Sequence, residues 1–224
     1  MLVCLFDIDG TLLSSGGAGK AAMEAALGSA FGVVEIRGRV PFAGRTDRAI
    51  GRDLFRAHGI DESAANWQRF VQHYLEHLPA CLGRHPGRVL PGIAGLLDHL
   101  RQRQGAVLGL LTGNLQQGAR LKLGHYDLAH HFAFGGYGDH HWDRDDVARD
   151  ALQRVHEYCN GSLGPEQLWV IGDTPLDVSC ARAIGARVAA VATGVHSLAE
   201  LEAARPDCLL ADFSDPTPLL RLWS

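Results

Sequence analysis

Two aspartates two residues apart follow the first apolar run of the chain. Asp7 and Asp9 lie in the stretch FDIDGTLL, directly after LVCLF, whose unbroken apolar character is typical of a strand covered on both faces. Charged groups at the end of a buried strand cost free energy unless something occupies the site. Because residues i and i+2 of a strand share one face, both carboxylates can reach one reacting centre. One can then act as nucleophile and the other as general acid and base.

Two later apolar runs also end in polar residues, in the stretches AVLGLLTGN and QLWVIGDTPLD. Sites in parallel sheets form beyond the carboxyl ends of the strands, so these ends are expected to meet Asp7 and Asp9 in one crevice. Four acids gathered there would repel one another, and a hard divalent cation, most simply Mg²⁺, would relieve the repulsion. No Cys/His ligand set lies nearby in sequence, which disfavours zinc. The converging side chains are Asp7, Asp9, Thr112, Asn114, Asp173 and Asp177.

The order of the elements predicts an α/β fold with a doubly wound, Rossmann-like parallel sheet. Beyond Pro91, apolar strands alternate with helical stretches, which implies parallel crossovers. Residues 15–88 lack strong strand signals and contain helical stretches at 18–31, after Thr46 or Asp47, and at 64–82. We therefore expect a core domain made of residues 1–14 and 89–224, with an α-helical cap domain inserted at 15–88.

Composition narrows the class of protein further. The 224 residues are 46% hydrophobic and 21% charged, with a net charge of −4 and no basic block, so a nucleic-acid partner is disfavoured. No apolar run reaches membrane-spanning length, so no membrane partner is expected. Asp7 interrupts the first apolar stretch too early for a signal peptide. The five cysteines are scattered without a CxxC pair, which favours reduced thiols in a cytoplasmic protein.

The motifs DIDGTLL, LLTGN and GDTPLD, with a basic residue before the last, resemble in order those of the haloacid dehalogenase (HAD) superfamily. The insertion after the first motif resembles the helical cap of its phosphoglycolate phosphatase and β-phosphoglucomutase branch. The resemblance implies that Asp7 forms an aspartyl-phosphate while Asp9 protonates the leaving oxygen and then activates water. It implies a Mg²⁺ ion held by Asp7, the backbone carbonyl of Asp9 and Asp173, with Asp177 bound to the metal through water or orienting that shell. It also implies phosphoryl contacts from Thr112, Gly113 and Asn114.

Several assignments stay open at this level. Gly10 lets the backbone pass close to an anion, and the N–H groups after the strand can hold phosphate oxygens. Asp177 could instead cap the following helix. The basic residue of the third motif is expected to be Arg144, although no Lys-Pro pair is present and Arg149 and Lys122 are alternatives. Arg45 and Thr46 are the expected substrate contacts from the cap.

The predicted activity is a Mg²⁺-dependent phosphatase acting on a small phosphorylated metabolite, such as a phosphoglycolate-like compound or a sugar phosphate. A phosphosugar mutase would use the same core residues and is the main alternative. A carbon–halogen hydrolase is disfavoured, because haloacid dehalogenases lack the second aspartate of the first motif, here Asp9. A receiver-like binding module would be shorter and lack the insertion. A monomer and a homodimer are both compatible with the sequence.

Overall fold

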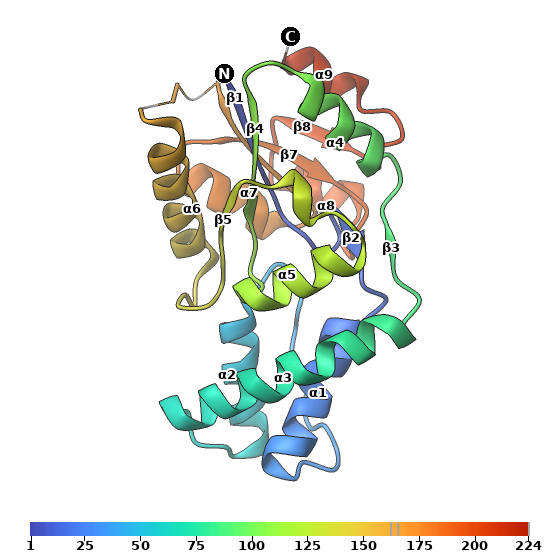
Figure 1. Ribbon diagram of the computed structural model, residues 1–224, viewed down its shortest axis with the longest axis vertical. Coiled ribbons are helices and arrows are strands. Elements are labelled where there is room, and N and C mark those ends of the chain that lie inside the picture. The colour runs from blue at the N-terminus through green and yellow to red at the C-terminus, as the bar shows by residue number, and fades with distance from the viewer. Residues whose placement is uncertain (162, 165, 224) are drawn as a thin grey trace.

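The computed structural model describes residues 1–161, 163–164 and 166–223. Its centre is a six-stranded parallel sheet with the strand order β5-β4-β1-β6-β7-β8 (Figure 1). The strand order reverses at β1, which lies between β4 and β6, and the crevice at such a switch point is where doubly wound sheets bind ligands. The predicted fold class is confirmed. The strands are β1 (Leu2–Phe6), β4 (Ala106–Leu111), β5 (Phe134–Gly136), β6 (Leu168–Gly172), β7 (Arg187–Val191) and β8 (Cys208–Leu210).

Helices cover both faces of the sheet, which explains the unbroken apolar runs of its central strands. In β1, Cys4 and Phe6 face one hydrophobic cluster while Val3 and Leu5 face the other, and all four are fully buried. The first cluster includes residues of α4 (Ile93–Gln102), α5 (Gln116–His125) and α9 (Thr217–Leu222). The second includes residues of α6 (Arg144–Cys159), α7 (Pro175–Ala183) and α8 (Leu198–Ala203).

Three further helices form a separate body below the carboxyl ends of the strands (Figure 1). They are α1 (Ala18–Phe31), α2 (Asp47–His58) and α3 (Ala64–Arg84), and they share their own hydrophobic cluster. The predicted helix 18–31 is confirmed, and the helix predicted over 64–82 extends to Arg84. Thr46 is the N-cap of α2, because its hydroxyl accepts a hydrogen bond from the Ala49 N–H at 3.1 Å.

The two chain segments that connect these bodies pair with each other. Strand β2 (Leu13–Ser14) and strand β3 (Arg88–Val89) form a two-stranded antiparallel ribbon that the sequence did not predict. Two residues per strand are too few to produce a period-two pattern. Because the expected domain limits at 15 and 88 fall at this ribbon, we propose that it joins the cap to the core.

The C-terminal helix α9 was also missed. Its six residues are too few for a helical period, but Leu219 is buried and the Trp223 ring packs edge-on against Trp169 at 5.8 Å between centroids. A 3₁₀ turn at Ala129–His131 precedes β5. Among the helices of the described residues, none combines the length and apolar character needed to cross a membrane.

Candidate functional site

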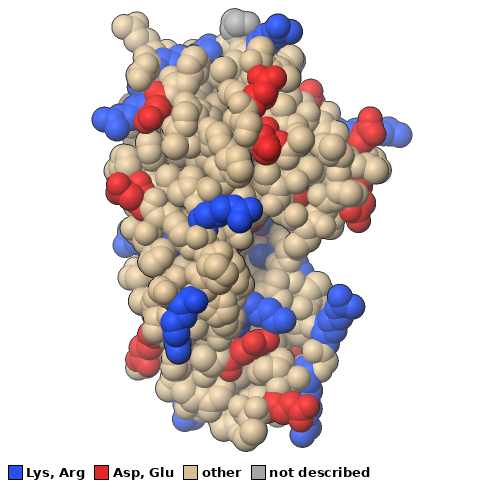
Figure 2. Space-filling view, turned by 90° about the vertical axis from the view of Figure 1, so that its right-hand side faces the viewer, with Lys and Arg blue, Asp and Glu red and all other residues tan. Residues whose placement is uncertain are grey.

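The carboxyl ends of β1, β4 and β6 meet at a cavity of about 410 Å³, whose lining combines residues of the core with residues of the three-helix body. Asp7 follows β1, Asn114 lies just beyond β4 and Asp173 follows β6, and all three line the cavity. The molecular surface has a notch between the two bodies at this level (Figure 2). The sequence therefore predicted correctly that these strand ends would meet.

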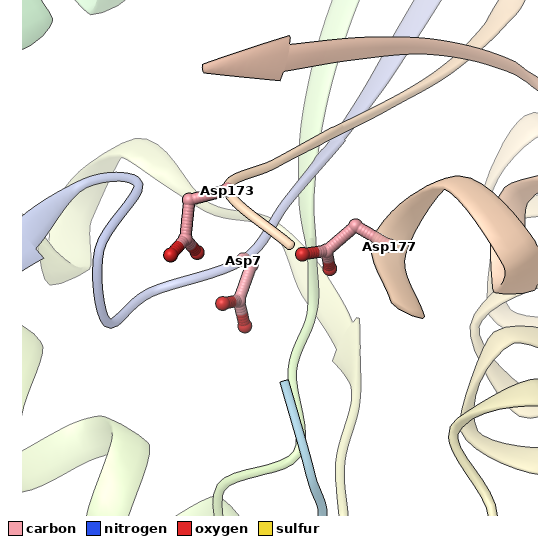
Figure 3. Close-up of side chains that lie close together, drawn as sticks. All are labelled: Asp7, Asp173 and Asp177. Atoms are coloured by element: carbon pink, nitrogen blue, oxygen red, sulfur yellow. The ribbon is translucent and has the colours of Figure 1, made fainter. Parts of the chain in front are cut away.

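Three buried carboxylates converge beside β1. Asp7, Asp173 and Asp177 each offer an oxygen, and these oxygens lie within 4.8 Å of one another (Figure 3). Burial, together with the Asp177 and Asp7 carboxylates, raises the pKa of Asp173 to about 9. Burial raises the pKa of Asp7 to about 6, although Arg144 opposes the shift. Repulsion of this kind is relieved by a cation, and an all-oxygen donor set suits Mg²⁺, so the residues present fit the expected metal.

Asp177 caps a helix and also belongs to the acid cluster. Its Oδ2 accepts hydrogen bonds from the Thr174 N–H at 2.9 Å and the Thr174 hydroxyl at 2.7 Å, which completes a capping box at the start of α7. Its Oδ1 lies 2.5 Å from Arg144 Nη2. The capping alternative is thus present in the structure, and it fixes the carboxylate beside Asp7 and Asp173.

Arg144 is the cation next to the expected nucleophile. Its Nη2 lies 3.0 Å from Asp7 Oδ1 and 2.5 Å from Asp177 Oδ1, and the residue is 5% exposed. The guanidinium also donates to the carbonyl oxygens of Gly44 at 3.2 Å and Leu111 at 3.3 Å. The alternative Arg149 is exposed and paired with Asp146, outside the cavity lining. Between the two arginines, only Arg144 can neutralise charge at Asp7.

Lys122, the other alternative, is also part of the site, but it serves the second aspartate. Its Nζ lies 2.5 Å from Asp9 Oδ2 and 2.6 Å from Asn114 Oδ1. Asp9 accepts further hydrogen bonds from Asn114 Nδ2 at 2.9 Å and Ser15 Oγ at 3.3 Å. Burial alone would raise the pKa of Asp9, but the Lys122 ammonium and these hydrogen bonds hold it below its usual value. The Asp9 carboxylate is not one of the three clustered acids.

The expected phosphate contacts divide into two groups. Gly10, at φ 85°, lines the cavity, and a Cβ there would overlap the Asp173 carboxylate. Asn114 lines it too, whereas Gly113 and Thr112 do not belong to its lining. The fully buried Thr112 hydroxyl accepts a hydrogen bond from Asn114 Nδ2 at 2.8 Å. The role left to Thr112 at a phosphoryl group is therefore to donate its own hydroxyl proton.

Of the two contacts expected from the cap, the structure brings only Arg45 to the cavity. Arg45 lines it, although its Nη2 is bound to Asp53 Oδ2 at 2.7 Å. The Thr46 side chain is 1% exposed and is used as the α2 cap and as a donor to the Trp142 carbonyl at 3.3 Å. Thr46 therefore positions α2 against the core, and we no longer assign it to substrate contact.

Several cavity residues were not singled out as site residues from the sequence. Asp47 was considered only as a helix cap, yet it lines the cavity and its Oδ2 accepts the Leu115 N–H at 2.8 Å. Tyr74 lines the cavity from α3, and Thr193 donates a hydrogen bond to the Gly10 carbonyl at 2.6 Å. The residues next to a lysine, tyrosine or threonine in a helix or loop do not reveal that it belongs to a site, because its partners lie more than a hundred residues away or in another helix. Lys122 was named from the sequence only as an alternative for the basic residue of the third motif.

Fold and site together define an α/β protein with a doubly wound parallel sheet, a separate three-helix body and a cluster of buried aspartates at the strand ends. The sequence model of the haloacid dehalogenase-like hydrolases matches residues 4–191, and the chain belongs to this family. The resemblance drawn from the motifs is confirmed.

Individual proteins similar to this one align with it over nearly its full length. A phosphoglycolate phosphatase from Synechococcus elongatus is 30% identical over 217 residues, which cover 96% of this chain and 95% of that protein. The crystal structure of CbbY from Rhodobacter sphaeroides in complex with phosphate aligns with a TM-score of 0.78 at 20% identity, over 100% of both chains. A variant of CbbY in complex with xylulose-(1,5)bisphosphate gives the same TM-score and identity over 99% of both chains. The structural likenesses support the fold.

Proposed function

We propose that this protein is a Mg²⁺-dependent phosphatase that hydrolyses a small phosphorylated metabolite through an aspartyl-phosphate on Asp7. The observation that carries the proposal is the separate environment of the two aspartates of the first motif. Asp7 belongs to the acid cluster, contacts Arg144 and has a raised pKa, while Asp9 is paired with Lys122 and has a lowered pKa. Two carboxylates whose environments differ in this way are suited to two different roles.

In the first step, an Asp7 oxygen forms a bond to phosphorus, and the bond from phosphorus to the leaving oxygen breaks. Asp9 gives its proton to that oxygen. The negative phosphoryl group near Asp9 and Lys122 favours the protonated acid, since nearby negative charge raises a carboxyl pKa. Arg144 balances charge on the transferring group, and Asn114 and Thr112 orient it. A Mg²⁺ ion held by Asp7, Asp173 and the Asp9 carbonyl, with Asp177 beside them, would supply further neutralisation of phosphoryl charge.

In the second step, Asp9 takes a proton from water as the water oxygen attacks phosphorus. The Asp7–phosphorus bond breaks, and inorganic phosphate leaves. Lys122 favours the deprotonated Asp9 that this step needs, because its ammonium stabilises the carboxylate.

The main alternative is a phosphosugar mutase, in which the phosphoryl group passes from Asp7 back to a sugar. The complex of CbbY with a sugar bisphosphate keeps sugar phosphates among the candidate substrates. Asp9 disfavours a carbon–halogen hydrolase, and the cavity between cap and core disfavours a receiver-like module. A cytoplasmic location stays part of the proposal and is compatible with the five free thiols.

Phosphate release from a panel of small phosphoesters, measured with Mg²⁺ and with EDTA, tests the activity and the metal together. EDTA should abolish release and added Mg²⁺ should restore it. Asp7→Asn and Asp9→Asn form a matched pair for the mechanism. Asp7→Asn cannot form the covalent intermediate, so no phosphoenzyme should be trapped by rapid quench. Full activity in EDTA would remove the metal from the proposal.

Asp9→Asn should lose general acid–base help worth ~10²–10⁴-fold in turnover. It should lose least with p-nitrophenyl phosphate, whose leaving group needs no proton, and it should accumulate phosphoenzyme because the base for water is gone. Mass spectrometry then locates the phosphate. A phosphorylated residue other than Asp7, or full turnover by Asp7→Asn, would overturn the mechanism.

A further inference from the structure

The cations that the three-helix body brings to the cavity are already paired with carboxylates of their own. Arg45 is bound to Asp53 at 2.7 Å and donates to the Pro41 carbonyl at 3.0 Å. Lys20 Nζ lies 3.7 Å from Glu24 Oε1 on the rim. Each positive charge that the three-helix body brings to the cavity therefore faces the substrate with a carboxylate beside it.

Tyr74, which lines the same space, carries a hydroxyl that has no partner among the described residues. The residue is fully buried and lines the cavity, and its Oη has no hydrogen-bond partner within the described part of the chain. The ring is held between Phe70, stacked at 6.5 Å, and Gly118 of α5, where a Cβ would come within 3.4 Å of Oη. A buried hydroxyl without a partner costs free energy, so a partner that arrives with the substrate is expected.

Asp47 supplies the complementary acceptor. It is 6% exposed and lines the cavity, and it is the charge that acts most strongly on the Tyr74 hydroxyl. Its Oδ2 is used by the Leu115 N–H, whereas no donor to Oδ1 is found in the described residues. No lysine or arginine nitrogen of those residues lies within 4 Å of this carboxylate, so its charge faces the cavity without a direct ion pair.

Resting on the phosphatase activity proposed above, we infer that Tyr74 and Asp47 form a subsite for a hydroxyl group on the leaving part of the substrate. A hydroxyl can accept from Tyr74 and donate to Asp47 at once, whereas an ammonium cannot accept and a carboxylate cannot donate. A carboxylate would also be repelled by Asp47. The apolar side chains of Met23, Phe42 and Ile50 line the same cavity and suit the carbon frame. The favoured substrate class is thus a phosphate monoester of a polyhydroxy alcohol or sugar, in preference to one of a hydroxy acid.

Four two-carbon phosphate esters that differ only at the far end test this directly. They are 2-hydroxyethyl phosphate, phosphoglycolate, phosphoethanolamine and ethyl phosphate, which end in a hydroxyl, a carboxylate, an ammonium and a methyl group. With the whole chain and Mg²⁺, we expect kcat/KM for 2-hydroxyethyl phosphate to exceed that of each of the others by about tenfold, the value of one good hydrogen bond. A higher kcat/KM for phosphoglycolate would overturn the subsite.

Two variants assign the preference to its residues. Tyr74→Phe should lower kcat/KM about tenfold for 2-hydroxyethyl phosphate and leave ethyl phosphate unchanged, and its Tm should not fall, because only an unpartnered hydroxyl is removed. Asp47→Asn keeps an oxygen for the Leu115 N–H but removes the charge, so the ratio of phosphoglycolate to 2-hydroxyethyl phosphate turnover should rise. Equal losses of kcat/KM on all four esters would show that Tyr74 and Asp47 do not recognise the hydroxyl group.

The generic substrate p-nitrophenyl phosphate separates this inference from the phosphatase proposal. If it is hydrolysed with Mg²⁺ while the four esters show no preference for the hydroxyl, the subsite is refuted and the phosphatase stands. If neither it nor any of the four esters is hydrolysed, both are refuted.

Discussion

At the scale of single residues, the site contains two buried cations with different partners. Arg144 bridges Asp7 and Asp177, and Lys122 bridges Asp9 and Asn114. The first lies beside Asp7, the proposed nucleophile, and the acid cluster. The second lies beside Asp9, the proposed general acid and base. One basic residue was expected from the motif pattern, and the structure places two at the strand ends.

Replacement of Lys122 by Met should show which step its charge serves. Without the ammonium, burial dominates and the pKa of Asp9 rises, so more of Asp9 is protonated at a given pH. The base step needs the deprotonated form, and the acidic limb of the kcat–pH profile should therefore move to higher pH. Turnover at neutral pH should fall by up to ~10²-fold. The profile is measured with p-nitrophenyl phosphate.

Lys20→Met is the matched control for this variant. Lys20 lines the same cavity, but its side chain is 60% exposed and its partner is Glu24. Its removal should leave the acidic limb in place. An equal shift of the acidic limb in both variants would assign the effect to the general charge of the cavity. If the acidic limb of Lys122→Met stays at the wild-type pH, Lys122 does not set the pKa of Asp9 in the base step.

At the scale of elements, the N-terminus of α2 is fixed to the core by close backbone contact. The Asp47 N–H donates to the Gly113 carbonyl at 2.7 Å, and a Cβ at Gly113 would overlap the Arg45 carbonyl oxygen. Thr46 donates to the Trp142 carbonyl and Arg144 donates to the Gly44 carbonyl, which adds two contacts between the start of α2 and the core. Since Asp47 belongs to the cavity wall, the position of α2 sets the shape of the cavity.

Gly113→Ala should therefore displace α2 from the core. We expect a loss of at least ~10-fold in kcat/KM, with a modest loss of stability of about 1–3 kcal/mol from the crowded contact. Gly83→Ala is the control, because Gly83 lies in α3 with no atom within 4 Å of the position that a Cβ would take, and it should gain ~0.5–1 kcal/mol from higher helix propensity. Urea unfolding and steady-state kinetics measure both variants. Normal kinetics in Gly113→Ala would show that this contact does not shape the site.

The sequence predicted elements well where one physical signal dominated. The continuous apolar runs LVCLF and LWVIG became buried central strands, and Thr46 capped a helix as its side chain allows. Strands β2 and β3 have two residues each, and their pairing depends on chain segments far apart in sequence. The pairing of Lys122 with Asp9 spans 113 residues in the same way. Such contacts arise from the tertiary fold, so neither periodicity nor residue type could predict them.

At the scale of the whole molecule, the switch point of the sheet collects three acids that the fold must keep together. Arg144 is the only basic residue within 4 Å of them in the described residues, and it contacts Asp7 and Asp177. Burial first, and then the Asp177 and Asp7 carboxylates, raise the pKa of Asp173 to about 9, and Arg144 offsets only part of this rise. Holding the three carboxylates together therefore costs the folded core electrostatic free energy, and a bound divalent cation would offset this cost.

This cost predicts how stability and metal affinity depend on pH. Between the ordinary carboxyl pKa near 4 and the raised values of about 6 for Asp7 and about 9 for Asp173, the metal-free folded protein binds more protons than the unfolded chain. Stability in EDTA should therefore fall as pH rises from about 5 to 9. Mg²⁺ competes with these protons, so its affinity should rise with pH, by up to ~tenfold per unit for each proton displaced.

Thermal unfolding in EDTA and in Mg²⁺, at pH values from about 5.5 to 8.5, measures both trends. The difference in Tm between Mg²⁺ and EDTA should widen as pH rises. Asp173→Asn removes the group with the largest pKa shift. In EDTA the Tm of this variant should therefore fall much less as pH rises, and Mg²⁺ should no longer stabilise it. Asp146→Asn, which changes an exposed acid paired with Arg149, should behave as wild type. A Tm difference that does not change with pH would mean that Mg²⁺ displaces no proton from the cluster, and the assignment of Asp173 as a metal ligand would then fail.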